Sequence, residues 1–131
     1  MSRNIMTEIG SGELIDKITI LEIKADRISD FEKLKNVKHE LSVLNAAYDA
    51  HLSGIEGLSD LATQLKTINE TLWEIEDDIR ACEARRDFGQ KFIDLARAVY
   101  ITNDKRAAVK KEINLLTGAN IIEEKSYKDF D

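Results

Sequence analysis

Residues 14–28 read LIDKITILEIKADRI, and the spacing of the apolar side chains in this stretch decides the predicted fold. Alternating steps of four and three residues connect Leu14, Ile18, Leu21, Ala25 and Ile28. Such spacing aligns the apolar side chains on one side of a helix and is typical of a coiled-coil seam. After one shortened step, the pattern resumes at Phe31 and continues to Leu52. The stretch therefore predicts a long helical segment, and a short break near Ser29 is left open.

A second stretch with the same period covers residues 61–99, beyond a loop that contains two glycines. Folded back at this loop, the two stretches keep one antiparallel register, in which Leu41 faces Leu72 and the irregular steps oppose each other. We therefore predict a long antiparallel coiled-coil helical hairpin, with residues 13–52 packed against residues 59–101.

The end of this hairpin far from the loop is apolar on more than one face, so a further element must pack there. We expect a third helix at about residues 104–117, which forms a small bundle at this open end and stops at Gly118. The last residues lack a helical period and predict an extended C-terminal tail. The fold class is all-α, and residues 1–131 are expected to form a single helical domain.

The composition agrees with a helical chain and disfavours several other classes. The 131 residues include no proline, whereas average usage of about 5% would give roughly six. The single cysteine excludes an internal disulfide framework. No apolar run approaches the roughly 18 residues of a membrane span, so we expect a cytoplasmic location and no membrane partner. A net charge of −6 without a basic tail disfavours a nucleic-acid partner.

The predicted register gathers polar side chains at the open end, where Asp16 would face Arg97 and Glu13 would face Tyr100. The candidate site residues are Glu13, Asp16, Lys17, Arg97, Tyr100, Asn103, Asp104 and Arg106. Convergent polar groups on a rigid apolar scaffold suit a ligand pocket. Ion pairs that fix the register of two helices would use the same residues, and this second interpretation is favoured.

Carboxylates at helical spacing suggest a different kind of site. Glu74 and Asp77 lie on one helix face, and Glu13 and Asp16 repeat that spacing. All-α nucleotide pyrophosphohydrolases hold Mg²⁺ with related pairs, because hard cations take several oxygen ligands. The register keeps the two pairs far apart within one chain. A solvated acidic face is therefore the favoured interpretation, and we expect no metal and no cofactor.

Apolar side chains off the seam pack either against another part of the same chain or against another chain. Trp73, Ile20 and Ile23 are the candidate interface residues, and tryptophan is enriched at binding hot spots. We expect a homodimer, a complex with another protein, or both.

Three segments resemble the signatures of an uncharacterised family of short all-α bacterial and phage proteins. These segments are GELIDKITILEIK (12–24), LARAVYITNDKRAA (95–108) and EEKSY (123–127). The family has no known activity, and the resemblance implies that its distinctive polar residues lie at the open end. The favoured function is a non-enzymatic helical interaction module that binds a protein partner. The alternative is a small all-α enzyme or ligand binder, similar to the Mg-dependent pyrophosphohydrolases, that acts on a phosphorylated or anionic metabolite there.

Overall fold

The structure, a computed structural model, describes residues 3–130. Within that range the chain forms four α-helices and no strand, which confirms the all-α prediction. The helices are α1 (Ser11–Arg27), α2 (Phe31–His51), α3 (Leu58–Ala84) and α4 (Gln90–Thr117). None of these four is long and apolar enough to cross a lipid bilayer.

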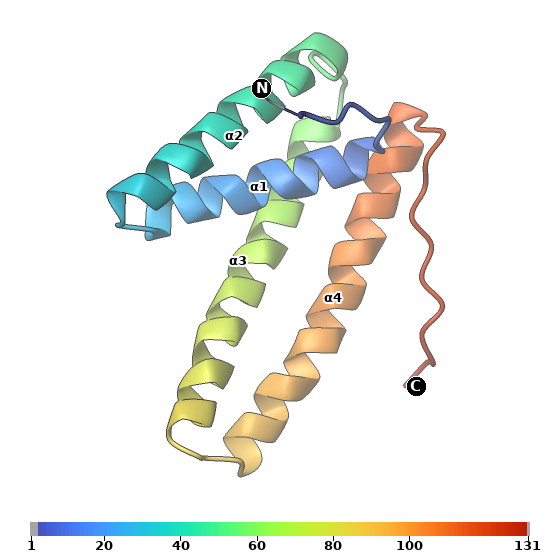
Figure 1. The fold of residues 1–131 in the computed structure, drawn as a ribbon. Helices are drawn as coiled ribbons and strands as arrows, with labels where there is room; N and C mark the ends of the chain where they lie inside the picture. Colours follow the sequence, from blue (N-terminus) through green and yellow to red (C-terminus); the bar gives the residue numbers. More distant parts are fainter. Residues whose placement is uncertain (1–2, 131) are drawn as a thin grey trace.

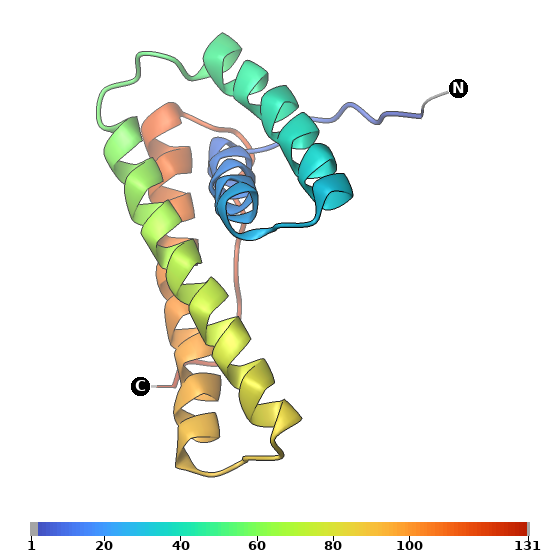
Figure 2. The ribbon, with the colours of Figure 1, turned by 90° about the vertical axis from the view of Figure 1, so that its left-hand side faces the viewer.

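The four helices form a body with two different ends (Figure 1). α3 and α4 make an antiparallel pair, and α1 crosses this pair near one end, which we call the base. α2 turns back along the outer side of α1 and packs closely on that helix alone (Figure 2). The other half of the α3–α4 pair projects away from α1 and α2. We call its free end, residues 85–93, the tip.

The predicted hairpin of residues 13–52 against residues 59–101 is wrong. Residues 13–52 form two helices that pack on each other, and the partner of α3 is α4. The error has a physical reason. Any two helices with the same apolar period can be set in a constant antiparallel register, so the register revealed a shared period and not a contact.

The two irregular apolar steps mark turns and not phase changes within one supercoil. After Arg27 the backbone of Ile28 becomes extended. Asp30 then caps α2, because its side chain accepts a hydrogen bond from the backbone N–H of Lys33 at 2.9 Å. The second irregular step falls in the turn at residues 85–89, between α3 and α4.

The predicted third helix at residues 104–117 is the second half of α4, which continues without a break through Asn103 and Asp104. These residue types cost only about 0.7 kcal/mol each relative to alanine within a helix, so they do not end one by themselves. The helix ends before Gly118, as predicted. That glycine has a left-handed φ of 69°, which is the usual way to end a helix.

The hydrophobic core lies at the base, where α1 meets the other helices. Its buried side chains are Leu14, Ile15, Ile18, Leu52, Leu58, Leu65, Val109 and Ile113. Partly buried side chains of α2, among them Leu41 and Leu44, pack against this cluster. A small bundle forms here from α1, the first half of α3 and the second half of α4. It differs from the predicted one, because its core joins Leu14 to Leu52 and Leu58, which the predicted hairpin placed at opposite ends.

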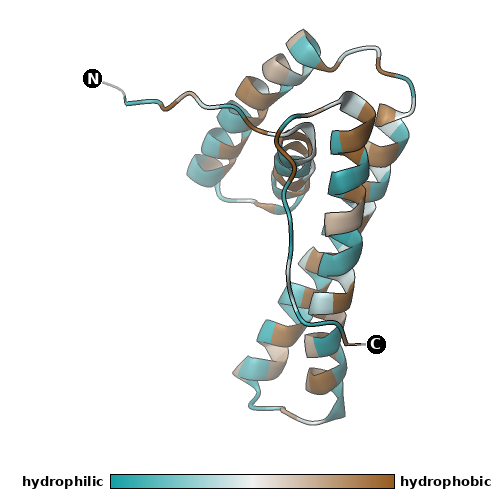
Figure 3. Cartoon of the chain, turned by 90° about the vertical axis from the view of Figure 1, so that its right-hand side faces the viewer, coloured by the Kyte–Doolittle hydropathy of each residue, from teal (hydrophilic) through white to brown (hydrophobic). Residues whose placement is uncertain are grey.

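Both terminal segments are extended. Residues 119–130 form the predicted tail, which runs back along α4 (Figure 3). Glu123 and Glu124 in the tail pair with Lys110 and Lys111 of α4. At the other terminus, residues 3–9 form an arm that is exposed and points away from the helices.

Candidate functional site

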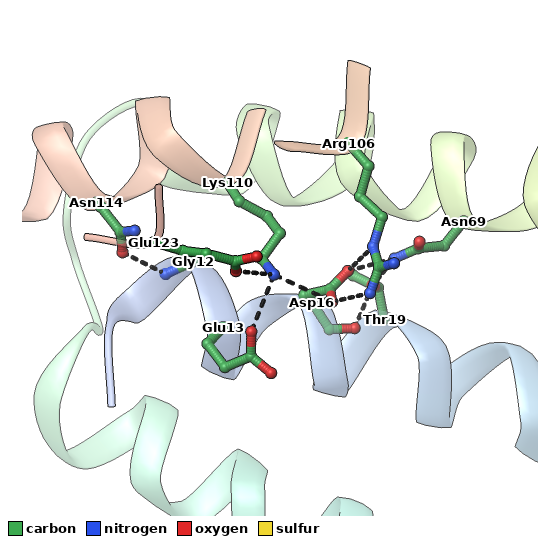
Figure 4. A network of polar contacts seen from close by, with 9 residues as sticks. All are labelled: Gly12, Glu13, Asp16, Thr19, Asn69, Arg106, Lys110, Asn114 and Glu123. Carbon is green, nitrogen blue, oxygen red and sulfur yellow. Dashed lines mark hydrogen bonds and ion pairs between the residues drawn. The ribbon is translucent and has the colours of Figure 1, made fainter. Parts of the chain in front are cut away.

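Asp16 lies at the centre of a polar network at the base (Figure 4). α1 places this side chain between α3 and α4, where it is only 2% exposed. Arg106 of α4 binds it with two donors. Nε donates to one carboxylate oxygen at 2.9 Å, and Nη2 donates to the other. Bidentate pairs of this kind are stronger and more directional than single hydrogen bonds.

α3 contributes an amide to the same carboxylate. Nδ2 of Asn69 donates to Oδ1 of Asp16 at 2.9 Å and to Oγ1 of Thr19 at 2.9 Å. The Thr19 hydroxyl donates in turn to the backbone carbonyl of Asp16 at 2.8 Å. One carboxylate thus joins three helices. No buried side-chain nitrogen or oxygen among residues 3–130 lacks a hydrogen-bond partner.

The charge of Asp16 is neutralised within the chain. Burial by itself would raise the pKa of this carboxyl, but hydrogen bonds from Arg106 and Asn69 and the charges of Arg106 and Lys110 lower it below the ordinary value. The hydrogen bond to Asp16 likewise raises the pKa of Arg106. An ionised carboxylate with its oxygens occupied has no proton to donate, and it has little capacity left to accept one from a substrate.

Lys110 extends the network to the tail. Its Nζ donates to Oε2 of Glu13 at 2.9 Å and to Oε2 of Glu123 at 3.0 Å, and it lies 3.7 Å from the Asp16 carboxylate. Burial would lower the pKa of Lys110, but these two hydrogen bonds raise it. The same contact lowers the pKa of Glu123. This lysine therefore ties the tail to α1.

Two glycines allow α1 to approach α4 and the tail closely. A Cβ on Gly12 would lie 2.5 Å from the backbone oxygen of Lys110, and a Cβ on Gly10 would lie 2.7 Å from that of Ile121. The N–H of Gly12 donates to Oδ1 of Asn114 at 2.8 Å. A first-turn N–H that has no acceptor within its own helix is thereby satisfied.

The polar network and the tail lie within one family match. Residues 5–130 match the family described as a family of unknown function, DUF6165. The chain belongs to this family. The prediction of an uncharacterised family is thereby confirmed. No curated protein and no solved structure matches this DUF6165 chain.

The DUF6165 structure brings together three of the eight predicted site residues. Glu13, Asp16 and Arg106 meet at the base, and Arg106 occupies the place predicted for Arg97. The predicted pair of Asp16 with Arg97 does not form. Because α1 crosses α4 and does not run alongside it, only residues at the crossing come into contact.

The other predicted site residues form no side-chain hydrogen bond or ion pair with Asp16. Arg97 is exposed on α4 in the direction of the tip. Tyr100 is 45% exposed and lies near Phe130 of the tail, with ring centroids 5.4 Å apart, so it does not meet Glu13. Lys17 and Asp104 are exposed, and Asn103 is half-buried.

The amides of the network were not among the predicted site residues. Asn69 lies four residues after Leu65, on the same face of α3, and it is 5% exposed. Asn114 follows the buried Ile113 and is 4% exposed. A polar amide within an apolar stripe is a signal that could have found Asn69. No comparable signal points to the Thr19 contact, which depends on where α3 lies.

An open groove of about 230 Å³ lies next to Lys110, between the arm, α1, α4 and the tail. The lining residues are Glu8, Ile9, Gly10, Glu13, Lys110, Asn114, Ile121 and Glu123. In the described part of the chain, no three His, Cys, Asp or Glu side chains gather as a metal ion would require. Glu74, a member of the carboxylate pairs considered for Mg²⁺, pairs with Arg27.

The candidate interface residues have different environments. Ile23 is 3% exposed and belongs to the interior of the chain, which corrects its assignment to an interface. Ile20 and Trp73 are half-buried. The Arg27 guanidinium lies 5.9 Å from the centre of the Trp73 ring, so part of this tryptophan is covered by its own chain.

Proposed function

We propose that this DUF6165 chain is a non-enzymatic helical interaction module, and that its protein partner is a second copy of the chain. The observation that carries the proposal is the arm, residues 3–9. Ile5 and Met6 in the arm are 88% and 91% exposed, although both are large apolar side chains. The arm extends beyond the helices (Figure 2), where a second chain can reach it.

The arm gains little from its own chain. No backbone hydrogen bond connects residues 3–9 to any other described residue. Burial of one isoleucine or methionine side chain contributes about 1.5–3 kcal/mol. Docking of both side chains on a partner would therefore offset part of the conformational entropy lost when the arm is ordered.

The base supports a scaffold role in preference to catalysis. The oxygens of Asp16 are occupied by Arg106 and Asn69. Lys110 is the single cation among the residues that line the groove, and it is shared by Glu13 and Glu123. An enzyme for an anionic metabolite needs a cation free to meet its substrate. For this reason the interaction module is favoured over the enzyme.

The proposal is tested by the mass of the chain in solution, which light scattering measures after gel filtration. We expect a dimer for the full chain and a monomer for Ile5→Asp and Met6→Asp, because a carboxylate buried at an apolar contact is strongly unfavourable. Val43→Asp adds the same charge at an exposed apolar position of α2, outside the arm, and should remain a dimer. Circular dichroism checks that all variants keep their helices.

A photocrosslinker gives an independent readout. With benzoylphenylalanine in place of Met6, irradiation of the purified chain should yield covalent dimers. A full chain that is monomeric at high micromolar concentration, and that forms no crosslinked dimer, would refute self-association through the arm.

A further inference from the structure

The groove at the base has more carboxylates than cations. Glu8, Glu13 and Glu123 line it, against the single cation Lys110. Glu13 and Glu123 each accept a hydrogen bond from Lys110 through Oε2, and Glu8 forms no ion pair with any described residue. A further cation placed here would meet several carboxylate oxygens and balance the excess negative charge.

The groove also has apolar walls. Ile9 and Ile121 line it, and each is 46% exposed. Its volume of about 230 Å³ is below the roughly 300–1,000 Å³ of pockets that enclose small-molecule ligands. A space of this size suits one or two side chains of a peptide. The chemistry of the groove thus calls for a short segment that combines a cation with apolar neighbours.

The arm has this chemistry. Arg3 is followed closely by Ile5 and Met6, and all three side chains are exposed. Glu8 and Ile9 at the root of the arm line the groove of their own copy. The rest of the arm points away from the helices (Figures 2 and 3). The five residues before Glu8 can span up to about 17 Å when extended, which is long enough to reach a facing molecule.

We propose that the groove of one copy receives the arm of a second copy. Arg3 would meet the carboxylates of the groove, and Ile5 and Met6 would pack on Ile9 and Ile121. This inference rests on the proposed self-association and names its docking site. Because arm and groove are adjacent in each copy, a twofold arrangement exchanges both arms and forms the same contact twice.

Charge reversal tests the contact, with the dimer dissociation constant measured by sedimentation velocity. Arg3→Glu and Glu8→Lys should each raise the dissociation constant about ten-fold or more, since close charge pairs across interfaces couple strongly. The double variant, which reverses both signs, should return to within about three-fold of the unchanged chain. Lys38→Glu, an equal reversal on the exposed face of α2, is the control and should have no effect.

Disulfide formation between different variants tests the position of the arm. A disulfide requires the two Cα atoms to come within about 7 Å, and the proposed contact brings positions 5 and 121 of different copies together. A mixture of Ile5→Cys and Ile121→Cys chains should therefore form a mixed disulfide under mild oxidation. A mixture of Ile5→Cys with Val43→Cys, on the outside of α2, should not.

The outcomes separate this inference from the proposed function. A dimer that Met6→Asp dissociates but that both charge reversals leave intact would overturn the groove as docking site and leave self-association standing. A mixed disulfide with position 43 in place of position 121 would place the arm on α2 and also overturn the groove. A monomeric full chain would overturn both.

Discussion

The base and the tip contain similar charged side chains, which are paired and partly buried at the base and exposed at the tip. At the base, Arg106 and Lys110 both bind carboxylates, and Asp16 is almost fully buried. At the tip, Arg86 and Lys91 are exposed and pair with no carboxylate in the described residues. The same types of residue therefore hold the fold together at one end and remain in water at the other.

The number of elements that meet explains the difference. Three helices and the tail exclude water at the base, so each buried polar group there needs a partner within the chain. Only two helices meet at the tip, where charged side chains stay hydrated and an ion pair would contribute little. Substitutions should accordingly have large effects at the base and small ones at the tip.

The largest effect is expected at Asp16. Asp16→Asn should lower the free energy of unfolding by about 3 kcal/mol, because it removes the counter-charge of the partly buried Arg106. Urea unfolding followed by circular dichroism measures this change. Asp78→Asn, at an exposed position of α3, is the matched control and should lie within about 0.5 kcal/mol of the unchanged chain.

The pH dependence of stability shows how much of the contribution of Asp16 to stability comes from its charge and how much from the packing of its side chain. The partners of Asp16 hold its folded pKa below the ordinary value of an aspartate, so the folded chain binds fewer protons than the unfolded chain in acid. The contribution of Asp16 is thus complete above the ordinary aspartate pKa of about 4 and is lost as the pH falls through the folded pKa. Asp16→Asn should lack this part of the acid loss. Parallel acid curves for both proteins would contradict the role given to the ion pair.

A smaller loss is expected where α1 approaches α4. Gly12→Ala should cost about 2 kcal/mol, because its Cβ would lie 2.5 Å from a backbone oxygen and the helices would have to separate. Gly89→Ala at the tip is the control. Its Cβ would lie 3.4 Å from Asp87 at an ordinary φ of −80°, so it should cost less than about 1 kcal/mol. Equal losses at the two glycines would refute the close approach at the base.

The smallest change is expected at the tip, with the opposite sign. Arg86 has a left-handed φ of 57°, the single such value outside glycine among residues 3–130. Arg86→Gly should raise the free energy of unfolding by about 0.5–1 kcal/mol, because glycine adopts this conformation without a steric cost. Lys91→Gln, which removes an exposed charge nearby, should leave thermal and urea unfolding unchanged. A loss of stability in Arg86→Gly would show that the arginine side chain holds the turn.

Local sequence signals predicted where helices end better than which helices pack together. The shortened apolar step near Ser29 is a true helix break, and Gly118 ends α4 as expected. The Asn103-Asp104 pair did not end a helix, because a mild propensity penalty is overcome when both flanking turns pack against other helices. Asp16 and Arg106 were both predicted for one site, but the predicted partner of Asp16 was Arg97 and not Arg106.

By itself, the sequence determined that this DUF6165 chain is helical and that helices end near Ser29 and at Gly118, because apolar period and helix-ending residues act over a few positions. Only the tertiary structure decided that α3 pairs with α4, that α1 crosses them, and that Asn69 and Lys110 complete the network. Helices of equal period are interchangeable partners in a one-dimensional pattern. Their choice of partner depends on where the chain turns, and on which buried charges and close-packed glycines fit together in space.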